Sequence, residues 1–275
     1  MPRKKSFRKN GPVSVERPIN NGDIVQKIWA EIGTYEHQGW KVPEDRRLLA
    51  SIAGHEATDA FYEISDSARQ NIELRKLLKE PLRSQDTEKR NAAIKWIVYD
   101  WGNIPPREDQ DEDRLFEMCK ELNNFENEDV KSFIKRYKID RIASWSKVLA
   151  FADSSKYAIF DARVAMALNA ILDKLGHQRK FFMPQSISTP LNKVFSHVRQ
   201  KMKVDFNGKK HSYMGYSEYI ELLTSFVEAD LATSVLEGEM RLFAQGRKLG
   251  NSYAAKYGLE IPYEDELQLD LQLAS

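Results

Sequence analysis

The most informative stretch of the sequence is Glu128–Leu175, which reads EDVKSFIKRYKIDRIASWSKVLAFADSSKYAIFDARVAMALNAILDKL. Apolar residues recur in it at helical spacing over three stretches: Glu128–Tyr137, Arg141–Ala152 and Asp161–Leu175. Because only the turn Lys138–Asp140 separates the first two, we expect them to pack as an antiparallel pair. Asp161 opens the third helix, where an aspartate side chain can accept hydrogen bonds from backbone N–H groups.

The same periodicity extends over most of the chain. Further helices are predicted at Asp23–Gly33, Glu44–Ile64, Ser65–Glu80 with a stop at Pro81, Thr87–Trp101, Thr189–Val204, Tyr216–Leu236 and Glu239–Leu249. The one strand signal is Val204–Tyr213, where Asn207-Gly208 is typical of a hairpin turn. The pattern predicts an all-α protein.

Composition excludes several classes of protein. Apolar residues make up 41% and charged residues 30% of the 275 residues, which is typical of a folded globular chain. We expect no transmembrane helix, because no apolar run approaches the roughly 18 residues needed, and no secretory signal behind the basic start. Cys119 is the only cysteine, which excludes an intramolecular disulfide, a cysteine-ligated zinc site and a four-cysteine iron–sulfur cluster. We therefore expect a cytoplasmic protein without metal or cofactor.

Charge is segregated along the chain, although the net charge is only +1. Met1–Asn10 holds five basic residues and no acid, and Glu260–Ser275 holds five acids and no base. Lys174–Lys210 carries nine basic residues against the single acid Asp205. Such runs are usually solvated surface, but a surplus of this size also predicts a polyanionic partner.

The central segment resembles the helix-hairpin-helix DNA glycosylase superfamily, which includes endonuclease III and 8-oxoguanine glycosylase. Those enzymes carry a hairpin L-P-G-V-G, a helix ending in an apolar run, and then V-D-T-H-V with the catalytic aspartate. Here Val148–Ala152 matches the end of that helix, and Ile159–Val164 stands where the family has V-D-T-H-V. The resemblance places the catalytic carboxylate on Asp161 and implies two helical lobes with a central cleft.

Two departures from the family pattern are informative. An ungapped alignment places Tyr137–Arg141 at L-P-G-V-G, so the hairpin glycines are missing. The same alignment puts Ala143 where two-step members carry a lysine that forms a Schiff base; a gapped alignment recruits Lys147 but shortens the second helix. The ungapped alignment implies a one-step hydrolase that leaves an abasic site. The gapped alignment is compatible with an enzyme that also has lyase activity.

The chemistry suits the aspartate. Cleavage of an N-glycosidic bond builds positive charge on the sugar, which a carboxylate can stabilise while it takes a proton from water. The base must first be flipped out of the duplex into a pocket. The competing interpretation is that Asp161 only caps the helix and has no catalytic role.

Other candidate residues fall into two sets. Those that can contact phosphate are Lys138, Arg141, Arg163, Arg199, Lys201, Lys203, Lys209 and Lys210; solvated surface or pairing of Arg163 with Asp161 are the alternatives. Those that can line a base pocket are Tyr99, Trp101, His211, Tyr213 and Tyr216, with core packing as the alternative.

The sequence divides into five predicted parts. They are a basic tail at 1–14, a helical part of the second lobe at 15–86, the hairpin lobe with Asp161 at 87–175, a basic part of the second lobe at 176–259, and an acidic tail at 260–275. We expect a monomer that acts on double-stranded DNA with a modified base.

The resemblance is compatible with more than one substrate. A likeness to bacterial antiphage glycosylases suggests glucosylated hydroxymethylcytosine, and removal of alkylated or oxidised bases in repair is an alternative. A non-enzymatic helix-hairpin-helix DNA-binding protein and a helical module for an acidic protein partner are the other interpretations.

Overall fold

The computed structural model of the chain describes residues 19, 22–33, 46–106, 111–122, 125–185, 192–198, 200 and 213–259, and this part is mostly helical. The prediction of an all-α protein is confirmed for these residues. The first half contains α1 (Gly22–Ile32), α2 (Arg46–Ala53), α3 (His55–Tyr62), α4 (Ser67–Leu82), α5 (Thr87–Lys95), the π-helix η1 (Trp96–Trp101) and α6 (Asp111–Lys120). The second half contains α7 (Asn127–Tyr137), α8 (Ile142–Ala152), α9 (Ala162–Lys174), α11 (Tyr216–Glu228) and α12 (Val235–Lys256), and residues 192–198 and 200 are also helical.

Several predicted helices differ in the structure, including the one at 87–101, which continues after Lys95 as the π-helix η1, and the one at 239–249, which is part of the longer α12. The predicted helix at 44–64 breaks at Gly54, whose φ of 95° no helix accommodates, into α2 and α3. Helix α4 includes Pro81 and ends at Leu82, so the proline that was expected to stop the helix lies within its last turn. The predicted helix at 216–236 ends at Glu228, and α12 starts afresh where the Ser234 side chain accepts from Glu237 N.

The predicted hairpin strand lies outside the described residues, except for Tyr213. Next to it, Met214 forms an isolated parallel bridge with Phe181, in which Met214 N donates to Lys180 O and Phe182 N donates to Met214 O. No other β-pairing is found among the described residues.

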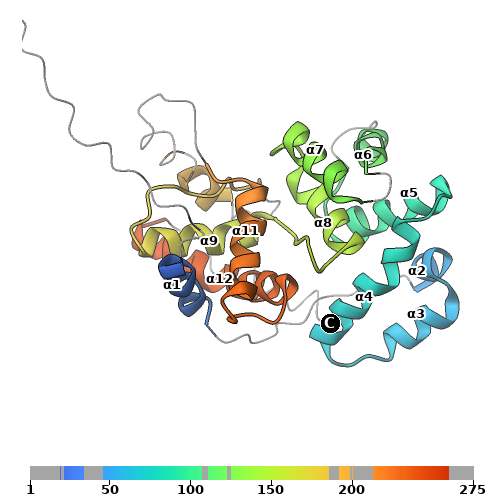
Figure 1. The fold of residues 1–275 in the computed structure, drawn as a ribbon, viewed down its shortest axis with the longest axis horizontal. Helices are drawn as coiled ribbons and strands as arrows, with labels where there is room; N and C mark the ends of the chain where they lie inside the picture. Colours follow the sequence, from blue (N-terminus) through green and yellow to red (C-terminus); the bar gives the residue numbers. More distant parts are fainter. Residues whose placement is uncertain are drawn as a thin grey trace, which may run out of the picture.

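The helices pack in two sets. Helix α9 lies along α12, and α1 and α11 contact one or both of them, whereas α2, α3, α5 and α8 contact α4 (Figure 1). Contacts cross both of the predicted boundaries at residues 86 and 175, because α4 packs with α5 and α8, and α9 packs with α12. Helices that are far apart in the sequence therefore pack against one another in the fold.

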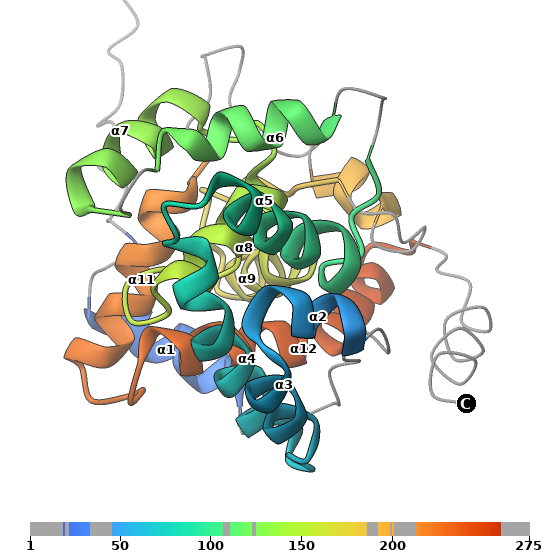
Figure 2. The ribbon, with the colours of Figure 1, turned by 90° about the vertical axis from the view of Figure 1, so that its right-hand side faces the viewer.

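Helices α8 and α9 are the most enclosed elements, and the other helices surround them (Figure 2). Nearly every residue of both is buried, including Trp145 at 0% exposure. The Trp145 ring packs edge-on against Phe133 of α7, and its Nε1 donates to Asp140 O over 2.7 Å, which fixes the turn between α7 and α8. The predicted tight turn is thus anchored in the core, and α8 ends directly before the segment that leads to Asp161.

No helix in the described ranges is long and apolar enough to cross a membrane.

Candidate active site

Asp161 is the N-cap of α9, as its place before the apolar pattern predicts. Its Oδ1 accepts hydrogen bonds from Arg163 N and Val164 N, each over 3.0 Å. The other carboxylate oxygen, Oδ2, accepts no hydrogen bond from a described residue, and the side chain is only half-buried. The carboxylate can therefore cap the helix with one oxygen and present the other to a ligand.

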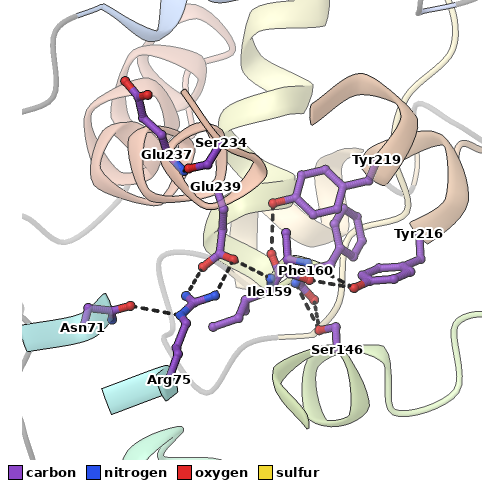
Figure 3. Close-up of polar contacts among 11 residues, drawn as sticks. Asn71, Arg75, Ser146, Ile159, Phe160, Tyr216, Tyr219, Ser234, Glu237 and Glu239 are labelled. Carbon is purple, nitrogen blue, oxygen red and sulfur yellow. Dashed lines mark hydrogen bonds and ion pairs between the residues drawn. The ribbon is translucent and has the colours of Figure 1, made fainter. Parts of the chain in front are cut away.

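The connector Ala158–Phe160, which leads into Asp161, is held by side chains alone. Tyr216 Oη accepts from Ala158 N and donates to Ala158 O, and Tyr219 Oη donates to Ile159 O (Figure 3). Every N–H and C=O group of these three residues has a side-chain partner. The remaining pairs are Ile159 N to Glu239 Oε2, Phe160 N to Ser146 Oγ, and Ser146 Oγ to Phe160 O. These partners come from α8, α11 and α12, so distant helices determine where Asp161 lies.

A buried ion pair supports the connector from behind. Arg75 of α4 donates to both carboxylate oxygens of Glu239 on α12, over 3.0 and 2.5 Å, and both side chains are 1% exposed. Arg75 Nε also donates to Asn71 Oδ1, and its guanidinium lies over the ring of Phe151. The pair joins α4 of one helix set to α12 of the other (Figure 3).

Lys147 is a buried amine on α8. Burial lowers the pKa of Lys147, whereas the carboxylates of Asp161 and Glu239 act to raise it. Its Nζ donates to Ala143 O over 3.0 Å, so the side chain extends back one turn along α8. The ungapped alignment gave Ala143 the position of the family's lysine, and the structure brings the Lys147 amine to that same turn.

Gly102 lies against this lysine, just after η1. A Cβ there would come within 2.7 Å of Ile97 O and Val98 O and within 3.0 Å of Lys147 Cδ. The close approach therefore requires glycine. Single π-helical turns such as η1 are frequent at functional sites.

Two of the predicted pocket residues lie on η1. Trp101 is half-buried and packs edge-on against Phe151 of α8, with ring centroids 4.9 Å apart. Tyr99 is half-buried, and burial raises the pKa of its phenol while nearby Arg141 lowers it. The structure thus brings Trp101 close to the Lys147 side of α8 and Tyr99 close to the hairpin.

The other predicted pocket residues have different positions. Tyr216 is 2% exposed, and its hydroxyl is fully engaged by the connector, so it supports Asp161 from inside the core. Tyr213 is half-buried beside the Phe182 ring, and His211 lies outside the described residues.

The hairpin turn adopts an unusual backbone. Arg141, which stands at the second glycine position of the family motif, has φ 53° and ψ 28°, the left-handed conformation that glycine favours. Lys138 also has a positive φ, of 51°, and is exposed. The turn therefore has a glycine-type conformation at Arg141 without glycine, at a cost of roughly 1–2 kcal/mol.

The remaining predicted phosphate contacts are Arg163 and five residues of the basic segment. The guanidinium of Arg163 lies 4.5 Å from the centroid of the Phe243 ring, and its stem packs where Gly246 leaves room, so this side chain joins α9 to α12. Outside the described residues lie Arg199, Lys201, Lys203, Lys209 and Lys210.

No group of histidine, cysteine, aspartate or glutamate within the described ranges could hold a metal ion. Burial raises the pKa of Cys119 to about 12, which makes it an unreactive core thiol.

Arg75 and Glu239 are not among the site residues that the sequence predicts. An arginine within the apolar pattern of α4 and a glutamate between Gly238 and Met240 are the only local signals of their burial.

Comparison of the chain with models of protein families, with curated proteins and with solved structures finds no match.

Proposed function

We propose that this protein is a DNA glycosylase of the helix-hairpin-helix type. It flips a modified base out of double-stranded DNA and hydrolyses the N-glycosidic bond, leaving an abasic site. The observation that carries the proposal is the carboxylate of Asp161, with one oxygen capping α9, the other without a partner among the described residues, and a rigid connector behind it.

Each part of the site has a role in the proposed reaction. The Oδ2 atom of Asp161 faces the sugar, stabilises the positive charge that develops as the bond to the base breaks, and takes a proton from the attacking water. Trp101 and Tyr99 line the pocket for the flipped base. Lys138 and Arg141 at the hairpin contact phosphate, with the basic segment 174–210 and the N-terminal tail, across a cleft between two helical lobes.

The proposed substrate is DNA that carries glucosylated hydroxymethylcytosine, as an antiphage defence in the bacterial cytoplasm, with the protein acting as a monomer. Alkylated or oxidised bases are the alternative substrates in a repair role.

The test is incubation of the protein with duplex DNAs that each carry one of these base types, followed by alkali, which cleaves at abasic sites. Strand breaks only after alkali, on one modified DNA and not on unmodified DNA, are expected. Tight binding to all DNAs without any breaks would instead favour the non-enzymatic DNA-binding protein, and no binding at moderate salt would favour the module for an acidic protein.

A second candidate function follows from Lys147. A buried amine whose pKa is lowered carries more of the neutral form that attacks a sugar carbon, so a two-step glycosylase with lyase activity is the alternative. Borohydride separates the two: a covalent enzyme–DNA adduct that Lys147→Ala abolishes would establish the lyase. The one-step hydrolase gives no adduct and retains base release in Lys147→Ala.

A further inference from the structure

Among the four side chains that hold the connector Ala158–Phe160, only that of Glu239 is charged. Its Oε2 accepts from Ile159 N over 2.8 Å and at the same time from Arg75 Nη1 over 3.0 Å. The Ile159 N–H is buried, so it requires an acceptor inside the protein. Ile159 lies just before Phe160, whose C=O is bonded to the N atom of Asp161.

Arg75 determines the orientation of this carboxylate. Its two Nη atoms bind the two oxygens of Glu239, and such a bidentate pair fixes the plane of both groups. Asn71 holds Arg75 Nε over 3.0 Å, so the arginine is itself fixed from one turn back along α4. The cap of α12 at Ser234, just before Glu239, sets the start of the helix that carries the carboxylate (Figure 3).

We infer that Glu239, with Arg75 as its counter-ion, is a positioning residue that orients the Asp161 carboxylate through the Ile159 peptide. The inference rests on the proposed function, because it assigns Glu239 a part in the base-release step. Glu239 does not touch the substrate in this scheme.

Stability alone gives no reason for an ion pair at this place. Replacement of a buried ion pair by apolar side chains of similar volume is often neutral or stabilising. An apolar side chain cannot accept the Ile159 N–H, however, and the connector would then lose one of its six side-chain hydrogen bonds. If Glu239 positions the connector, residue 239 must accept the Ile159 N–H, whereas a negative charge is not needed. If Glu239 only fills space in the core, neither the acceptor nor the charge is needed.

Two double variants of the full chain test this difference. Arg75→Met with Glu239→Gln removes the charges but keeps an acceptor for Ile159 N. Arg75→Met with Glu239→Met removes the charges and the acceptor, and neither variant leaves a buried charge without its partner. We measure single-turnover base release at saturating DNA on glucosylated hydroxymethylcytosine duplexes, the dissociation constant for the same DNA, and amide hydrogen exchange in the 157–163 segment.

The Gln-containing variant is expected to keep the wild-type rate within about threefold. The Met-containing variant is expected to lose about ten- to a hundredfold, because misplacement of a catalytic group by about 1 Å can cost about a hundredfold in rate. Affinity for DNA stays the same in both, and exchange in the 157–163 segment rises only in the Met-containing variant.

Equal rates and equal exchange in the two variants would overturn the inference while leaving the proposed function intact. A wild type that releases no base from any modified DNA would overturn the proposed function, and with it the catalytic part of this inference. The exchange measurement would then still establish whether Glu239 holds the connector.

Discussion

The two links that border α8 are built in opposite ways. The turn before it, residues 138–141, has positive φ angles at Lys138 and Arg141, and Lys138 is exposed. The link after it ends in the buried connector Ala158–Phe160, where side chains hold all six backbone polar groups. The first link suits contact with a large partner outside the protein, whereas the second suits precise placement of one side chain. In the proposed glycosylase these are the tasks of gripping phosphate and of holding Asp161.

The largest expected effect is at the end of the connector. Asp161→Asn should reduce base release by about a hundredfold or more, because the neutral amide cannot stabilise the developing positive charge on the sugar. Stability and DNA binding should change little, since asparagine is also a good N-cap. Single-turnover rates and thermal unfolding measure the two effects.

Asp86→Asn is the matched control for this substitution. Asp86 caps α5 in the same way, with Oδ1 accepting from Glu88 N and Lys89 N. Base release should be unchanged in this variant. A loss of activity that is equal in the two variants would show that capping, and not catalysis, is the role of Asp161.

The second prediction tests the connector itself. Ser146→Ala leaves the buried N–H and C=O of Phe160 without partners, and it should lower the free energy of unfolding by about 1–3 kcal/mol. Ser225→Ala is the control, because its Oγ donates only to Glu221 O of its own helix and its loss should cost about 0.5 kcal/mol or less. Urea unfolding of both variants measures this, and equal midpoints would contradict the tight hold on the connector.

The sequence predicts the local features around α8 better than the contacts between residues that are far apart in the chain. Periodicity and the cap preference of aspartate indicate α7, α8, α9 and the place of Asp161, because these depend on neighbours within one or two helical turns. The contact of Glu239 with Ile159 joins residues 80 positions apart, and no local pattern encodes it. Tyr216 illustrates the same limit: its spacing beside Gly215 is as compatible with a pocket as with the buried support that the structure shows.

The third prediction concerns the left-handed backbone conformation of Arg141, in the turn before α8. At Arg141, glycine should give a more stable protein than alanine by about 1 kcal/mol, because only glycine adopts a positive φ without steric cost. At Lys131, an exposed position in α7, the order should reverse by about the same amount, since glycine is the poorer helix former. Urea unfolding of the four variants checks the sign at each site, and the same order at both would exclude the left-handed turn.

The smallest expected effect is at the tip of the hairpin. If Lys138 contacts a phosphate, Lys138→Gln should weaken binding to modified and unmodified DNA alike and reduce the slope of log affinity against log salt by about 0.9. Lys131→Gln is the control, because Lys131 is also exposed but forms an ion pair with Glu128 on the surface of α7. Affinity measured over a salt series should show the reduced slope for Lys138→Gln only. Identical slopes for both variants and the wild type would show that Lys138 does not contact DNA. Phosphate binding would then not explain the positive φ angles of the turn.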